Sequence, residues 1–230
     1  MPTIVFCSPK GGSGKTTSAL LLAIQLSDFY DVTLIDADPN RPIKEWAAGG
    51  NVPPRLSIVS DVDENNIVER IEDAATRTPM VIVDLEGTAA KIVLLALSQA
   101  EFAVVPTQGS QLDAKESSRA IKVIRQTQKM TGRELPFAVL LTRTNSKIRT
   151  RTLSHIQREL IEAGIPVLET ELNEREAFRA VFSFRVPLTR LNPAEVANLD
   201  KAQANVAMLA LEILKKLVPA ADSEQGAKVA

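Results

Sequence analysis

Glycine, lysine and hydroxyl residues near the N-terminus follow one another in an order that suits phosphate binding. Residues 10–17 read Lys-Gly-Gly-Ser-Gly-Lys-Thr-Thr. Glycine lets backbone N–H groups converge on anionic oxygens without interference from a Cβ atom. Lys15 is spaced to supply a cation to the β- and γ-phosphates of a nucleotide, and the Thr16 hydroxyl is a suitable Mg²⁺ ligand. The candidate nucleotide-binding residues here are Lys10, Gly11, Gly12, Ser13, Gly14, Lys15, Thr16 and Thr17.

The residues on either side supply the elements that such a loop needs. Residues 3–7 are a short apolar run that predicts a buried strand, and residues 18–26 contain neither Gly nor Pro and predict a helix. The positive end of that helix dipole would face the anion. The generic pattern has a glycine where this chain has Pro9, so the motif is a variant. An ordinary glycine-rich turn with surface lysines is the alternative, and the flanking strand and helix disfavour it.

Aspartates stand at the carboxyl ends of two further predicted strands. Asp36 and Asp38 follow the β-rich residues 32–35, and Asp84 follows the apolar residues 80–83. Ligands of open α/β sheets bind at the carboxyl ends of the strands. Phosphoryl transfer needs charge neutralisation and a positioned nucleophile, which carboxylates and a metal ion can supply. An isolated Asp-x-Asp can also be a solvated turn, but its place on the strand after the loop favours a functional role.

The octapeptide at residues 10–17 resembles the signature loop of the ParA/MinD family of deviant Walker-type ATPases, and the compact chain is most similar to the small plasmid-partition members. The resemblance implies ATP and Mg²⁺ as cofactors and a homodimer in the ATP state. It assigns Lys10 to the nucleotide of the partner subunit and Asp38 to the attacking water. Asp36 and Asp84 would join Thr16 in holding Mg²⁺ and its water shell. The implied catalytic residues are Lys10, Lys15 and Asp38.

The chain departs from the family pattern beside these acidic residues. The family has Asp-x-Asp-Pro-Gln where residues 36–40 of this chain read Asp-Ala-Asp-Pro-Asn, so Asn40 stands in place of the glutamine. The family also continues Asp-x-Pro after the second strand, whereas here Asp84 is followed by Leu85-Glu86-Gly87. The Glu86 carboxylate can change how water is held, although the residues alone give no reason to choose it over Asp38 as a base. A loose match to the family's adenine-contacting loop adds Arg143 and Asn145 as ATP-binding candidates.

Strands alternate with helical patterns along the chain, which predicts an α/β fold with a single doubly wound, mostly parallel sheet flanked by helices. We expect one P-loop ATPase domain over residues 1–218 and a disordered tail over 219–230. Trp46 is expected to pack in the core. Further strands are expected at 56–59, 102–106, 137–141 and 167–168, and capping patterns predict helix starts near Thr88, Asp113, Asn173 and Asn192.

Composition excludes several classes of protein. The 230-residue chain has 27 Lys and Arg against 28 Asp and Glu, which argues against a histone-like basic protein but allows a local basic face. Cys7 is the only cysteine, so an intrachain disulfide and a Cys₄ metal site are excluded and an intracellular location is favoured. No stretch approaches the roughly 20 apolar residues of a membrane span, and no N-terminal signal is expected.

Basic residues gather in two stretches of the C-terminal half. Residues 142–158 and 177–190 contain arginines but no acidic residue. Such stretches can neutralise DNA phosphates without reading the base sequence. The family resemblance implies nonspecific binding of double-stranded DNA by the ATP-bound dimer, with a solvated charged face as the alternative. The candidate DNA contacts are Arg149, Arg151, Arg179 and Arg185.

These expectations describe a ParA-like ATPase of the bacterial cytoplasm. Its ATP-bound dimer would bind the nucleoid, and a ParB-like adaptor on plasmid DNA would stimulate hydrolysis. Positioning of a protein cluster or microcompartment would use the same machinery. A MinD-like membrane-cycling ATPase is another alternative, because residues 211–218, with Lys215 and Lys216, imitate an amphipathic helix. We expect no stable membrane association, since packing explains that helix. A third alternative is a metabolic enzyme related to dethiobiotin synthetase.

Overall fold

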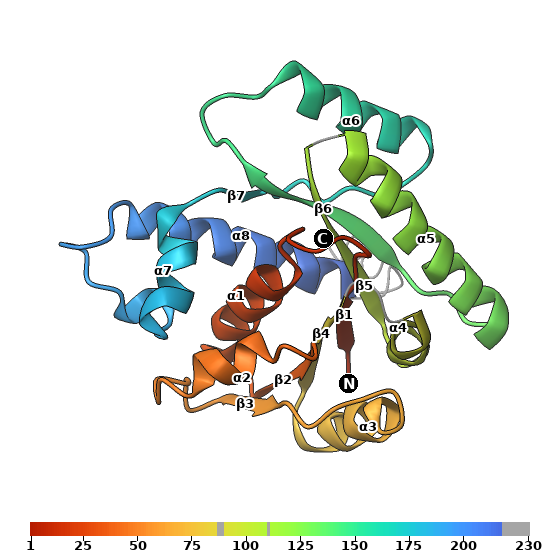
Figure 1. Ribbon diagram of the computed structural model, residues 1–230, viewed down its shortest axis with the longest axis horizontal. Helices are drawn as coiled ribbons and strands as arrows, with labels where there is room; N and C mark the ends of the chain where they lie inside the picture. The colour runs from red at the N-terminus through yellow and green to blue at the C-terminus, as the bar shows by residue number, and fades with distance from the viewer. Residues whose placement is uncertain (87–89, 110, 218–230) are drawn as a thin grey trace, which may run out of the picture.

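A parallel sheet forms the centre of the protein, shown as a computed structural model in Figure 1. The structure describes residues 1–86, 90–109 and 111–217. Within this part of the chain the sheet has the strand order β3-β2-β4-β1-β5-β6-β7, and each paired strand is parallel to its neighbour. The strands are β1 (Thr3–Phe6), β2 (Val32–Ala37), β3 (Leu56–Val59), β4 (Met80–Leu85), β5 (Phe102–Gln108), β6 (Phe137–Thr144) and β7 (Leu172–Asn173).

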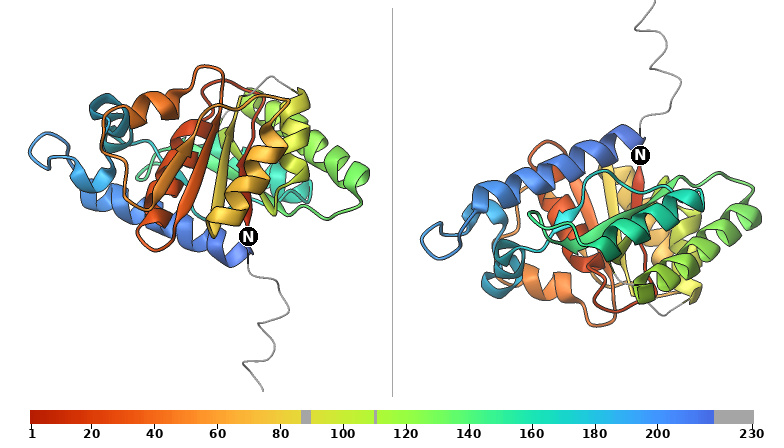
Figure 2. Two further views of the ribbon diagram at one scale, coloured as in Figure 1. Left: turned by 90° about the horizontal axis from the view of Figure 1, so that it is seen from below. Right: turned by 90° about the horizontal axis from the view of Figure 1, so that it is seen from above.

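Helices cover both faces of this sheet, which confirms the predicted doubly wound α/β architecture (Figure 2). One face packs against α1 (Lys15–Ser27), α2 (Pro42–Ala47), α7 (Glu176–Phe184), the short 3₁₀ helix η1 (Leu188–Arg190) and α8 (Leu199–Leu217). The other face packs against α3 (Ile67–Arg77), α4 (Ala90–Ser98), α5 (Gln111–Thr131) and α6 (Arg151–Glu162). None of the described helices is both long and apolar enough to cross a membrane.

The two cores follow from the alternation of side chains along each strand. In β1, Ile4 and Phe6 point to the core under α1 and α8, whereas Val5 and Cys7 point to the opposite core. Strands that are buried on both faces read as continuous apolar runs, which is why residues 3–7 and 80–83 were recognisable. Burial also raises the pKa of the Cys7 thiol to about 12. Trp46 lies in the first core, as predicted, and is only 2% exposed.

Several predicted helix starts are wrong. Helix α5 already begins at Gln111, so Asp113 lies within the helix and not at its start. The N-cap of α7 is Arg175, without a side-chain capping bond, because Asn173 belongs to β7 instead. There its backbone N–H donates to Asn205 Oδ1 (3.0 Å). The expectation for Thr88 lies outside the described residues.

The last helix also starts later than the sequence suggested. Asn192 Oδ1 accepts a hydrogen bond from the Ala194 N–H (3.0 Å) and closes a turn. Asn198 then adopts a left-handed backbone conformation (φ 58°), which a continuous helix cannot contain. Helix α8 therefore begins at Leu199. The expected strand at 167–168 is a single bridge between Val139 and Val167, and β7 takes its place at the sheet edge.

Candidate nucleotide-binding site

The loop between β1 and α1 has the conformation that phosphate binding requires. Gly12 and Gly14 have positive φ angles of 76° and 95°, which L side chains rarely adopt. Helix α1 begins at Lys15, so the loop leads directly into its N-terminus. The Lys15 side chain is 7% exposed and its Nζ donates to the Lys10 carbonyl (3.2 Å). This contact holds the amino group against the loop and uses one of its N–H donors, which leaves the others for an anion.

The tips of two neighbouring strands hold the loop in place. The Thr142 hydroxyl on β6 donates to the Ser13 carbonyl (2.7 Å), and Gln108 Nε2 on β5 donates to the Gly12 carbonyl (2.6 Å). A Cβ atom at Gly14 would touch the Thr142 side chain at 3.4 Å. Because outside donors occupy these carbonyl groups, their negative ends are directed away from an anion in the loop. Sequence reasoning missed both supporting residues, which lie far from the loop in the chain.

The buried acids lie side by side on adjacent strands. Asp36 of β2 is in register with Asp84 of β4. Asp36 Oδ2 accepts hydrogen bonds from the backbone N–H groups of Ile43 and Lys44 (both 2.9 Å) at the start of α2. Its Oδ1 is buried without a hydrogen-bond partner among the described residues. Burial raises the pKa of Asp36, and these backbone hydrogen bonds partly offset the effect.

Asp84 is the more isolated of the two carboxyl groups. It is fully buried, and within the described part of the chain neither carboxyl oxygen makes a hydrogen bond of normal geometry. Burial raises its pKa to about 7, and the charge of Asp36 adds to this, whereas the Thr16 hydroxyl and the Lys15 cation lower it. Buried carboxylates are normally paired or bound to a metal. The set of Thr16, Asp36 and Asp84 therefore fits a hard cation such as Mg²⁺, which prefers oxygen ligands.

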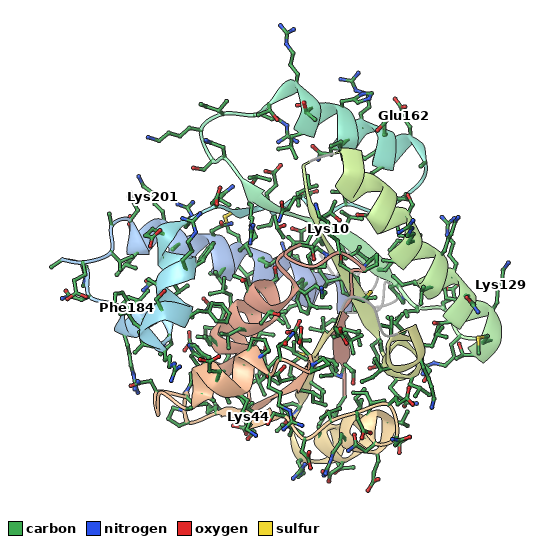
Figure 3. All side chains as sticks on the ribbon, viewed as in Figure 1. Lys10, Lys44, Lys129, Glu162, Phe184 and Lys201 are labelled. Atoms are coloured by element: carbon green, nitrogen blue, oxygen red, sulfur yellow. The ribbon has the colours of Figure 1, made fainter. Side chains whose placement is uncertain are left out.

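The loop borders a pocket of about 300 Å³, whose lining includes Lys15 and Thr16 but neither Asp36 nor Asp84. Asp38 lines it at the end of β2, and its Oδ1 accepts a hydrogen bond from the Asn40 N–H (2.8 Å). Figure 3 places Lys10 centrally, on the loop, whereas labelled residues such as Lys129 lie at the rim of the molecule. The lining residues are Pro9, Gly11, Gly12, Gly14, Lys15, Thr16, Thr17, Asp38, Asn40, Glu86 and Arg143.

A second pocket of about 290 Å³ adjoins the first and shares Gly14, Thr17 and Arg143 with it. Its remaining lining comes from β6, β7, α7 and the residues before α7, and includes the rings of Phe178 and Phe182. Arg143 reaches both pockets because the register shifts between Thr142 and Thr144, and a bulge of this kind re-aims the side chain. A planar, partly apolar group next to a phosphate site fits this combination of rings and cations.

Asn145 does not belong to this second pocket. Its Oδ1 accepts hydrogen bonds from the N–H groups of Lys147 (2.9 Å) and Ile148 (3.0 Å), so it stabilises a turn. It lines a third cavity, together with Lys10 and Thr150. Of the two predicted ATP-binding residues, Arg143 lines all three pockets, whereas Asn145 lines only the third, which Lys10 of the loop also lines. The rings of α7 were missed because their helical spacing is also typical of core residues.

The candidate DNA-contacting arginines fall on two separate parts of the molecule, around α6 and α7 (Figure 1). Arg149 pairs with Glu171 (2.9 Å), and Arg185 pairs with Glu45 (2.7 Å). Arg179 pairs with Glu174 and Glu176 and lines the second pocket. Arg151, the first residue of α6, is exposed and forms no ion pair within the described residues. The stretches without acidic residues are thus partly neutralised by acids from elsewhere in the chain.

The sheet, the loop and the buried acids at the ends of β2 and β4 together define a P-loop nucleotide-binding protein of the ParA/MinD type. The VirC1 protein family model matches residues 1–221, and the chain belongs to that family. It is 36% identical over 221 residues to Protein ParA of Rhizobium radiobacter, which covers 96% of this chain and 99% of the relative. Maintenance of carboxysome distribution protein A of Halothiobacillus neapolitanus is 27% identical over 179 residues, or 77% and 82% of the two chains.

Solved structures have the same fold at low sequence identity. The ATP complex of a Cyanothece McdA variant superposes with a TM-score of 0.72 at 16% identity, covering 92% of this chain and 96% of that one. MinD of Pyrococcus horikoshii in complex with Mg-ADP superposes with a TM-score of 0.68 at 16% identity, covering 98% and 97%. These similarities confirm the predicted fold class.

Proposed function

We propose that this protein is a Mg²⁺-dependent ATP hydrolase that acts as a ParA-like switch in the segregation of plasmid DNA. The observation that carries the proposal is the buried Asp84 carboxylate, which makes no hydrogen bond of normal geometry among the described residues and lies near Lys15. A buried lysine next to a buried carboxylate that lacks a normal hydrogen bond among the described residues is suited to receive an anion and a metal ion together. The names of the ParA and VirC1 relatives support the same activity.

The proposal divides the chemistry among the loop, the residues that line the first pocket and the two buried acids, Asp36 and Asp84. Loop N–H groups and Lys15 neutralise the triphosphate, and Thr16, Asp36 and Asp84 hold Mg²⁺ and its water ligands. Mg²⁺ bound there would supply positive charge that offsets the negative charge of the phosphoryl group in transfer. Asp38 lies half-buried at the end of β2 with one carboxylate oxygen committed to Asn40, so its other oxygen is available to orient the attacking water.

The second pocket takes the base and sugar of the nucleotide in this proposal. It opens from Gly14 of the loop and Thr17 in the first turn of α1, and its lining includes Phe178 and Phe182. Adenine would stack on an aromatic or guanidinium surface there. Arg143 then acts at the junction of the two pockets, and Arg179 belongs to the nucleotide site and not to a DNA surface.

Dimerisation and DNA binding complete the proposed cycle. Lys10 lines the third cavity at the mouth of the loop, and we assign it to the nucleotide of the partner subunit in an ATP-bound homodimer. The dimer binds double-stranded DNA nonspecifically in the bacterial cytoplasm. The exposed Arg151, with nearby Lys147 and Arg158, is the best-placed basic group around α6. A ParB-like adaptor bound to the plasmid would stimulate hydrolysis and release the dimer.

Positioning of a protein cluster is the second candidate, favoured by the name of the Halothiobacillus neapolitanus relative. It would use the same nucleotide and DNA cycle with a different adaptor. Membrane cycling is disfavoured, because α8 buries Leu209 and Ile213 against the sheet and so uses its apolar side for packing. Exposed Leu211 is an exception on the outer side of that helix.

The test combines ATP hydrolysis, with and without DNA, with measurement of particle size in ATP and in ADP. We expect slow hydrolysis, a dimer in ATP alone, and DNA retention by that dimer. Lys15→Ala should abolish ATP binding, and Asp38→Ala should retain an ATP-bound dimer that does not hydrolyse. Lys122→Ala, an exposed site on α5, is the matched control. Flotation with anionic vesicles in place of DNA retention would instead support membrane cycling, and turnover that requires a small substrate would support a metabolic enzyme.

A further inference from the structure

Two adjacent strands end with the same arrangement of acidic residues. Strand β2 ends in Asp36-Ala37 and is followed by Asp38, and β4 ends in Asp84-Leu85 and is followed by Glu86. The strands are parallel, with Asp36 opposite Asp84 and Ala37 opposite Leu85. Asp38 and Glu86 are therefore the next residues after this register on two neighbouring strands. Neighbouring strands of a sheet lie about 4.8 Å apart. The pattern gives an inner pair and an outer pair of carboxyl groups at one edge of the sheet.

The two pairs have different environments. The inner pair, Asp36 and Asp84, is buried, at 1% and 0% exposure. The outer pair, Asp38 and Glu86, is half-buried, and both members line the pocket that contains Lys15 and Thr16. Only the outer carboxylates therefore face the space that a terminal phosphate and a water molecule would occupy.

The two inner acids also differ from the outer pair in their surroundings. One oxygen of Asp36 accepts hydrogen bonds from the backbone N–H groups at the start of α2. Asp84 is fully buried, and a buried carboxylate is normally paired with a cation. In the outer pair, one oxygen of Asp38 accepts the Asn40 N–H. A water molecule has two O–H groups to donate, and Asp38 supplies one remaining oxygen on one side of the pocket.

We propose that Glu86 is a further catalytic residue, which accepts a hydrogen bond from the attacking water while Asp38 accepts the other. This rests on the proposed ATP hydrolysis. In that step the water oxygen bonds to the γ-phosphorus, and the bond from that phosphorus to the bridging oxygen breaks. ADP leaves with the bonding electron pair, one water proton stays on the phosphate formed, and the other passes to solvent. Glu86 orients the water and carries no proton.

A second carboxylate in a phosphate pocket has an electrostatic consequence that separates this role from a structural one. Glu86 adds negative charge where the polyanionic nucleotide binds, so it weakens ground-state binding while it favours the oriented water. Replacing it with the neutral, similarly shaped glutamine should lower kcat without weakening nucleotide binding. A residue that only supports the fold of the pocket would lose affinity and turnover together.

The test compares Glu86→Gln with Glu86→Asp and with Glu72→Gln, a matched substitution at an exposed site on α3. Hydrolysis is measured in a single turnover at saturating Mg-ATP, and affinity is measured separately with Mg²⁺ and a fluorescent ATP analogue. We expect Glu86→Gln to slow hydrolysis at least about tenfold, as for loss of a positioned group, with equal or tighter binding. Glu86→Asp should restore part of the rate, and Glu72→Gln should match the native chain.

The outcomes separate this proposal from the proposed function. If the native chain neither binds nor hydrolyses ATP, the proposed function itself is wrong. If the native chain hydrolyses ATP and Glu86→Gln does so at the same rate, Glu86 has no part in the reaction. A rate loss in Glu86→Gln accompanied by an equal loss of affinity would also overturn the proposal, because it would mark Glu86 as a support of the pocket.

Discussion

The indole Nε1 of Trp46 donates a buried hydrogen bond to the Val181 carbonyl, at 3.0 Å, and so joins α2 to α7. Helix α2 begins at the backbone N–H groups that bind Asp36. Helix α7 carries Phe178 and Phe182 of the second pocket. The side chain of Trp46 therefore connects a helix that holds a candidate metal ligand to a helix that lines the candidate base pocket.

Trp46→Phe should destabilise the protein, because it leaves the buried Val181 carbonyl without its donor and removes part of a packed side chain. The expected loss of unfolding free energy is about 2–4 kcal/mol. Urea unfolding followed by circular dichroism measures it. Phe29→Leu, at a 67% exposed site just after α1, should change stability by less than about 0.5 kcal/mol. Equal effects of the two substitutions would contradict the importance of this contact.

Thr142→Val should weaken nucleotide binding more than it weakens the fold. The substitution keeps the shape beside Gly14 but removes the hydrogen bond to the Ser13 carbonyl. Without it the loop has more conformations to lose on binding, and the affinity for Mg-ATP should fall about five- to tenfold, equivalent to about 1–1.4 kcal/mol. Titration calorimetry measures this. Thr152→Val on the exposed surface of α6 is the control, and equal affinities in the two variants would remove Thr142 from loop support.

Asp84 should make the metal-free protein less stable as the pH rises. Burial raises the pKa of Asp84 from 3.8 to about 7, whereas the unfolded chain restores the ordinary value. Between these values the folded state holds a proton that the unfolded state has lost, so stability falls from about pH 4 to about pH 7 and then levels off. Asp84→Asn should lack this fall, a difference of a few kcal/mol at about 1.4 kcal/mol per pKa unit.

This comparison requires urea unfolding of both chains at several pH values in the presence of a chelator. Titrating groups that do not interact with Asp84 affect both chains alike, so the difference between the chains reports on Asp84 and its coupling to Asp36. A difference that stays constant from pH 4 to pH 8 would show that Asp84 is ionised throughout, and the unpartnered buried carboxylate would then need another explanation.

Arg151→Ala should weaken binding of the ATP-bound protein to DNA about three- to tenfold and make that binding less sensitive to salt. One fewer phosphate contact lowers the slope of log affinity against log salt by about one. Arg55→Ala is the control, because Arg55 lies before β3, away from α6, and pairs with Asp31 (3.2 Å). An unchanged slope in Arg151→Ala would locate the DNA contact elsewhere.

The local part of the site was predictable because it is continuous in the sequence. Residues 10–17 carry the loop, the cation and the hydroxyl in one segment, and Asp36 and Asp84 each end a run of apolar strand residues. Parallel strands that alternate with helices bring such segments to one edge of a sheet. The fold class and the first pocket therefore followed from short-range patterns.

The second pocket was not predictable, because it is assembled from segments that are remote from the loop. Phe178 and Phe182 have the spacing of core residues, and Arg143 reaches the pocket only through a bulge in β6. Local capping signals failed for a related reason. Asn173 resembles a helix cap in the sequence, but pairing with β6 and hydrogen bonds to Thr144 and Asn205 determine its conformation.

The burial of Cys7 has a practical consequence. It is the only cysteine in the chain, it is 2% exposed, and its high pKa keeps it in the unreactive thiol form. A cysteine engineered at an exposed position of α6 or α7 would be the one thiol open to a maleimide dye or spin label. Distances between such labels on two subunits can therefore be followed through a nucleotide cycle without replacing the native residue.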